Sequence, residues 1–163
     1  MDRPDRPAGR DETEDERLDR LFADILQELR VMQTGAQLTA GFLLTLPFQP
    51  RFMDLPGFEK GLYVVLVLLA ALTTALVLSP VAVHRHLSGR HIKRRVVAAA
   101  HRFVNGALTS LSLLLSGMVM LIVDVVVDRA WGIAVGGATL AVLVGLLVVL
   151  PRRMGAVDPV TPR

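Results

Sequence analysis

Two carboxylates, Asp124 and Asp128, are the side chains of this sequence best placed to bind a cation or a proton. Asp124 lies in a long apolar stretch, and a charged side chain at the centre of a bilayer costs about 2.5–3.5 kcal/mol. If one helix continues through both, a spacing of four residues puts the two carboxylates on the same face. The alternative is a polar cluster near a helix end, with Asp124 paired to Arg129 or Arg51.

Other chemistry finds little support in the residue types and their spacing. The chain has no Cys, which excludes disulfides, thiolate metal sites and Cys nucleophiles. Its four His residues, at 84, 86, 91 and 101, do not fall on one helix face, whereas a metal site needs several converging ligands. No nucleophile triad, phosphate-binding loop or dinucleotide fingerprint occurs. We therefore expect a protein that is not an enzyme, with no metal and no cofactor.

The elements that would position Asp124 are four stretches without Asp, Glu, Lys or Arg, at 31–50, 61–83, 103–123 and 130–151. Each has about the 20 residues that a helix needs to cross a bilayer. They predict a membrane domain over 31–151 with spans at about 31–50, 62–83, 103–127 and 131–150. The first span is the weakest, because Gln33, Thr34 and Gln37 occupy its early turns. In the alternative, residues 13–46 form an interfacial helix and only three spans cross.

Charged segments flank these spans. Residues 1–12 read as a flexible polar tail, and 152–163 as a second tail. Thr13 and Glu16 have the spacing of a capping box, and they open an acidic amphipathic helix over 13–30 with one apolar stripe. Residues 84–102 form a basic stem that leads into the third span. The predicted fold class is all-α, a four-helix transmembrane bundle with cytoplasmic amphipathic helical extensions.

The charge distribution predicts the orientation. With four spans, 15 of the 18 Lys and Arg residues lie on the side of the two termini and the basic stem. Basic residues collect on the cytoplasmic side, so we expect a multi-pass protein of the cytoplasmic (inner) membrane with both termini in the cytoplasm. This layout accounts for the net charge of +3 without nucleic acid as a partner. The partners of the stem are then anionic lipid headgroups or the acidic helix, contacted by Arg90, Lys93, Arg94 and Arg95.

Small and polar residues in the spans predict contacts between helices. Small residues every four positions allow helix backbones to approach closely; here they are Gly132 and Gly136, and, on an offset stripe, Gly137, Ala141 and Gly145. The partner is the third span or a second copy in a homo-oligomer. Polar side chains within the spans more often join helices than bind substrate, and we assign that role to Gln33, Gln37, Asn105, Ser112 and Ser116.

The segments 28–37, 42–48 and 51–52 resemble a family of small bacterial membrane proteins of unknown function with four predicted spans. The resemblance runs from about residue 15 to residue 150. It implies the same architecture and supplies no catalytic residues. Descriptions of similar proteins suggest sodium/proton exchange, for which Asp124 is the main support here. The expected function is that of a non-enzymatic structural, regulatory or accessory component of the membrane. The alternative is a small cation/proton transporter that acts as an oligomer.

Overall fold

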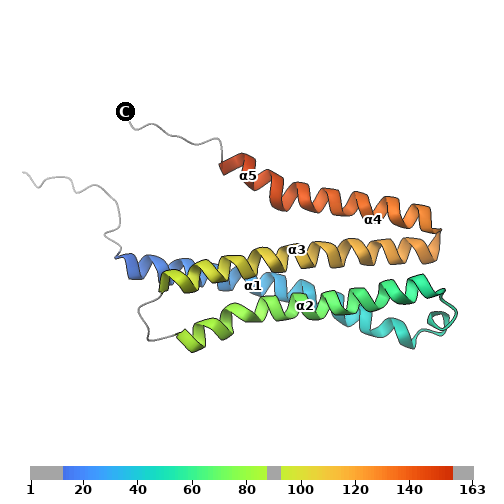
Figure 1. Cartoon of the computed structure of the whole chain (residues 1–163), viewed down its shortest axis with the longest axis horizontal. Coiled ribbons are helices and arrows are strands. Elements are labelled where there is room, and N and C mark those ends of the chain that lie inside the picture. Colours follow the sequence, from blue (N-terminus) through green and yellow to red (C-terminus); the bar gives the residue numbers. More distant parts are fainter. Residues whose placement is uncertain (1–12, 88–92, 156–163) are drawn as a thin grey trace, which may run out of the picture.

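The computed structural model describes residues 13–87 and 93–155, and within them the chain is built from long helices (Figure 1). These are α1 (Glu14–Thr45), α2 (Gly57–Leu87), α3 (Lys93–Val126) and α4 (Arg129–Val144). A π-helical turn, Gly145–Val149, joins α4 to the short α5 (Leu150–Gly155). The prediction of an all-α fold is confirmed. The tail predicted for 1–12, positions 88–92 of the basic stem and positions 156–163 lie outside the described residues.

The helices α1, α2 and α3 run alongside one another, and α4 follows α3 back along its length (Figure 1). The connection between α1 and α2, residues 46–56, lies at the same end of the molecule as the turn between α3 and α4, residues 127–128. We call this the hairpin end. The opposite end, where α1 and α3 begin and α2 finishes, is the stem end. Along its course α4 moves away from α3, so α5 stands apart from the other helices.

The start and finish of α1 follow from local chemistry. The Thr13 backbone N–H donates to Glu16 Oε2 at 2.9 Å, and the Thr13 hydroxyl accepts from the Glu16 backbone N–H at 3.4 Å. This confirms the capping box. From there α1 continues without a break to Thr45, so the acidic helix and the first apolar stretch are one element. Pro47 and Pro50 follow in two 3-10 turns, Leu46–Phe48 and Pro50–Phe52, because proline cannot continue the α-helical hydrogen bonds.

Another proline, Pro80, lies inside α2. A proline within a helix removes a backbone hydrogen bond and can end the helix, yet α2 continues to Leu87. The Pro80 side chain is fully buried. Neighbouring helices can support a helix through the missing hydrogen bond, and this burial gives Pro80 such support.

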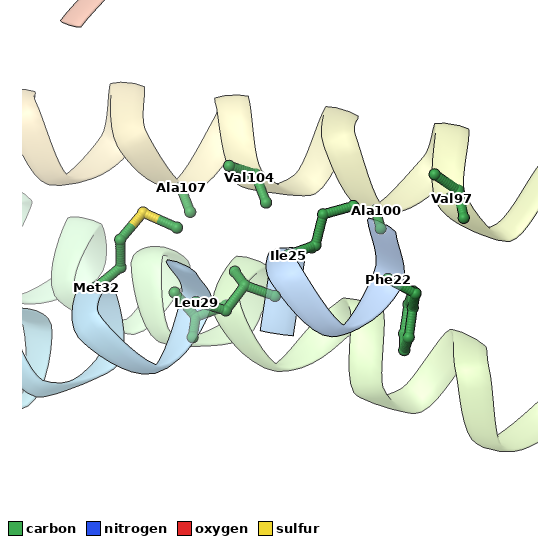
Figure 2. Packing of buried hydrophobic residues seen from close by; sticks show 9 residues of the cluster. Phe22, Ile25, Leu29, Met32, Val97, Ala100, Val104 and Ala107 are labelled. Atoms are coloured by element: carbon green, nitrogen blue, oxygen red, sulfur yellow. The ribbon is translucent and has the colours of Figure 1, made fainter. Parts of the chain in front are cut away.

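At the stem end, the apolar stripe of α1 packs on α3 (Figure 2). Ile25 and Leu29 of α1 are both 3% exposed, and Ala100 of α3 is 1% exposed. The acidic helix and the described part of the basic stem are therefore in direct apolar contact, through Val97 and Ala100. Arg90 lies outside the described residues, and Lys93, Arg94 and Arg95 belong to the first turn of α3. The contacts predicted for these four side chains stay a prediction. The full set of buried residues in this core is Phe22, Ile25, Leu29, Met32, Val77, Val97, Ala100, Val104 and Ala107.

A second core lies nearer the hairpin end. Leu43 of α1, Leu66 of α2 and Leu114 of α3 are at most 1% exposed and belong to one cluster. Between the two cores, the hydroxyls of Thr73 and Ser110 are 2.8 Å apart and join α2 to α3 by a hydrogen bond. Thr73 also donates to the Leu69 carbonyl of its own helix at 2.7 Å. These two buried hydroxyls thus have partners, as groups without access to water require.

Among the described residues, three helices are long and apolar enough to cross a membrane. They cover Gly57–Val83, Val97–Val126 and Arg129–Val149. In the described part of the chain, α1 does not meet the same criterion of length and composition. The prediction of membrane-spanning helices is therefore supported for the second, third and fourth apolar stretches and left open for the first.

The close contact between α3 and α4 depends on two glycines. A Cβ atom at Gly136 would stand 2.7 Å from Met120 Cβ and 3.2 Å from the Ser116 carbonyl oxygen; at Gly132 it would meet Asp124 Cβ at 2.9 Å. The structure thus places Gly132 and Gly136 against α3. The offset stripe does not face α3, since Gly137 and Gly145 have open space beside them and Ala141 is exposed.

We predict that Gly136→Ala destabilises the protein by about 1–3 kcal/mol, the usual cost of adding volume to a packed contact. Gly137→Ala is the matched control. It should leave stability unchanged or raise it by up to about 1 kcal/mol, because Ala favours a helix over Gly. Unfolding of the two variants in a mixed detergent titration measures the difference. Equal stability of both variants would contradict the assigned α3–α4 contact.

Candidate functional site

Charged side chains from three helices meet at the hairpin end. Glu59 lies in the first turn of α2, Asp124 in the last turn of α3, and Arg129 is the first residue of α4. The turn at 127–128 is so short that Arg129 returns directly beside the end of α3. We call Glu59, Asp124 and Arg129 the carboxylate cluster.

Arg129 is the centre of the carboxylate cluster. Its Nη2 donates a hydrogen bond to Glu59 Oε1 at 2.6 Å. Its Nε is 3.6 Å from Asp124 Oδ2, an ion-pair distance that is too long for a strong hydrogen bond. The guanidinium also lies 4.0 Å from the centre of the Phe58 ring, within the range of a cation–π contact. One side chain therefore links α4 to both α2 and α3.

The cluster contains more acid than base. The side chains of Glu59 and Asp124 are 6% and 4% exposed, whereas Arg129 is 47% exposed. Two ionised carboxylates and one guanidinium leave a formal charge of −1. Within the described residues, Glu59 Oε2 and Asp124 Oδ2 are buried without a hydrogen-bond partner. Buried charge without compensation is costly, so the arrangement can accept one proton or one monovalent cation as well as join the helices.

Asp128 lies at the start of α4. The premise that it shares a helix face with Asp124 is wrong, because α3 ends at Val126 and a new helix begins at Arg129. Asp128 is the N-cap of α4, and its Oδ1 accepts a hydrogen bond from the Trp131 backbone N–H at 3.0 Å. Its side chain therefore gives a hydrogen-bond partner to a backbone N–H in the first turn of α4, which has none within the helix.

The polar residues predicted to join helices fall into two groups. Ser112 and Ser116 are buried, but Ser112 donates to Leu108 of its own helix at 2.8 Å and Ser116 Oγ has no partner among the described residues. Gln33 is half-buried, while Gln37 and Asn105 are exposed. The hydroxyl pair that does connect two helices, Thr73 with Ser110, is not among the predicted residues.

Sequence reasoning also misses Glu59. It falls in a predicted polar loop because the apolar stretch begins two residues later, at Gly61. The available signal is Pro56 followed by Gly57, since a proline before a run of helix formers indicates a helix start. A helix that begins there places Glu59 in the first turn of α2, at the level of the end of α3.

A metal centre finds no support in the described ranges, where no group of three or more His, Asp or Glu side chains could hold an ion. The described part of the protein is all-helical, and its three long apolar helices fit a membrane location. The paired charges at the hairpin end do not by themselves indicate an activity. The model of a family described as a family of unknown function (DUF6328) matches residues 11–151. The chain belongs to this family, and the resemblance found in the sequence is confirmed. No curated protein and no solved structure matches the chain.

We predict that Glu59→Gln lowers the unfolding temperature more than Asp124→Asn. Glu59 makes the short charged hydrogen bond to Arg129, whereas Asp124 supplies the surplus negative charge, and its neutralisation removes a repulsion between the two carboxylates. Thermal unfolding in detergent measures the order. Asp54→Asn, at an exposed position of the same end, controls for loss of a carboxylate. If Asp124→Asn is the more damaging change, Asp124 rather than Glu59 is the main partner of Arg129.

Proposed function

We propose that the chain is a four-span protein of the bacterial cytoplasmic membrane, with α1 as the first span and both termini in the cytoplasm. The packing of α1 supports this. Its first half belongs to the core at the stem end and its second half to the core nearer the hairpin end, so α1 accompanies α2 and α3 along their length. Since α2 begins at the hairpin end and α1 finishes there, α1 starts on the opposite side of the bilayer. The basic residues concentrated toward the stem end then face the cytoplasm and its anionic headgroups.

Cysteine labelling tests this topology, because the chain has no Cys of its own. We predict that a membrane-impermeant maleimide labels Asp54→Cys from outside spheroplasts. Arg17→Cys in α1 and Arg153→Cys in α5 should react only after lysis. These three positions are exposed. Labelling of Arg17→Cys and Asp54→Cys from the same side would mean that α1 does not cross.

We further propose that the protein is a non-enzymatic structural, regulatory or accessory component of the membrane. The composition of the interior carries this proposal. Apart from the two carboxyl groups of the carboxylate cluster, the buried polar residues of the described ranges are Thr39, Thr73, Ser110, Ser112 and Ser116. Hydroxyls of this kind can donate to a backbone carbonyl of their own helix, as the Thr39 hydroxyl does to the Gly35 carbonyl at 2.9 Å. A proton relay through a membrane is usually a chain of ionisable groups, and in the described ranges the buried ones, Glu59 and Asp124, both lie at the hairpin end.

One observation favours cation or proton transport as a second candidate function. The carboxylate cluster has two buried acids for one base and two carboxylate oxygens without hydrogen-bond partners among the described residues. A bound proton or a monovalent cation would stabilise a buried site with this negative charge. Since the described interior of one copy offers no continuous row of ionisable groups below this site, transport would need a path formed between several copies of the chain.

A flux assay separates the two candidates. We predict that full-length protein in liposomes, with a trapped pH-sensitive dye and an imposed sodium gradient, moves protons no faster than protein-free liposomes. Asp124→Asn should behave identically, because neutralising one carboxylate changes no transport step. Sodium-driven proton movement that the Asp124→Asn variant loses while still folded would contradict the accessory role and establish the transport candidate.

A further inference from the structure

An apolar cavity of about 170 Å³ lies at the hairpin end, separate from the carboxylate cluster. On one side it is lined by the connection between α1 and α2, with Leu46, Phe52 and Leu55. On the other side it is lined by a face of α3, with Met118, Ile122 and Val125. Phe52 is fixed in this wall by an edge-on contact with Tyr63, with ring centres 5.0 Å apart. The cavity thus lies between two segments that are far apart in the sequence, and the contact with Tyr63 fixes one of its wall residues, Phe52.

The dimensions of the cavity match part of a lipid chain. Its wall on α3 runs from Met118 to Val126, which at the rise of an α-helix is about 12 Å along the membrane normal. One leaflet contributes about half of the roughly 30 Å of hydrocarbon. An engineered cavity of about 150 Å³ in another protein holds a benzene molecule, so this cavity has room for several methylene groups.

The surroundings indicate which end of a lipid lies where. Arg51 lines the cavity and is exposed, and within the described residues it has no ion-pair or hydrogen-bond partner for its side chain. Phe48 and Met53, on the same connection, are 86% and 73% exposed. Large apolar side chains exposed beside a free cation are suited to the boundary between headgroups and hydrocarbon. A phosphate at Arg51 would have its acyl chain directed along the apolar wall of α3.

We propose that this cavity is a binding site for an anionic phospholipid of the leaflet at the hairpin end, with one acyl chain between the α1–α2 connection and α3 and the phosphate at Arg51. The assignment needs only that α3 spans the bilayer, so it does not depend on the accessory role or on transport. Complementary charge selects an anionic lipid over a zwitterionic one, since a basic residue near a membrane surface attracts net negative charge.

Tryptophan fluorescence with brominated lipids tests the site in the full-length protein. The single Trp of the chain is first replaced by Trp131→Phe, and Phe52→Trp then supplies a reporter in the cavity wall. In phosphatidylcholine vesicles, brominated phosphatidylglycerol should associate with this reporter roughly fivefold more strongly than brominated phosphatidylcholine, the preference expected from one basic residue. Phe48→Trp, exposed at the same end and outside the cavity lining, is the matched control reporter and should show no preference.

Two further variants assign the effect to the cavity. Arg51→Gln should abolish the preference for the anionic lipid, whereas Arg30→Gln, exposed at the middle of α1 and outside the cavity lining, should not. Val125→Phe fills the cavity and should reduce quenching of the Phe52→Trp reporter, while Val127→Phe, exposed and outside the lining, leaves it unchanged. A reporter that no brominated lipid quenches would mean that the cavity is empty or covered by protein such as a second copy. That result, or quenching without dependence on Arg51, overturns the proposal.

Discussion

The guanidinium of Arg129 fixes the relative position of three helix ends, and much of the hairpin end depends on it. Two carboxyl groups, on α2 and α3, are removed from water beside it, and in a medium of low dielectric they require a nearby positive charge. The turn at 127–128 is short enough to bring Arg129 back to the end of α3 where α4 begins. With that point fixed, Gly132 and Gly136 come to lie against Asp124, Met120 and Ser116, where a larger side chain has no room.

The rest of the bundle is held by apolar contact and by hydroxyl groups. Leu43, Leu66 and Leu114 join α1, α2 and α3, and the Thr73–Ser110 hydrogen bond adds a polar link between α2 and α3. By contrast, α4 packs chiefly on α3 and turns a largely exposed surface outward. In a bilayer this surface contacts lipid, which is as apolar as the side chains it meets. The molecule therefore consists of a packed three-helix unit with a fourth helix attached along one side.

Features that depend on neighbouring residues in the sequence could be predicted, whereas features that depend on which helix ends meet could not. The capping box of Thr13 and Glu16 and the apolar stripe of α1 are local patterns, and the order of residues is enough to reveal both. Glu59 and Asp124 are 65 positions apart, so their meeting required knowledge of the helix pairing and of where α2 begins. The two glycine stripes of α4 have the same spacing, so the sequence does not show that Gly136, and not Gly137, faces α3. The shared helix face of Asp124 and Asp128 was wrongly predicted, because α3 ends at Val126 and does not continue through 128.

The pairing of α1 with α3 has a consequence for the order in which the protein is assembled. Phe22 and Ile25 lie in one core with Val97 and Ala100, so these partners are separated by some 75 residues of chain. Contacts between distant segments form late, after the intervening chain has been made and placed. α1 precedes both partners in the chain, and until α3 is in place only α2 covers its apolar stripe, through Leu76, Val77 and Val83. The core at the stem end is thus complete only once α3 lies against α1, although its α1 residues come long before its α3 residues in the chain.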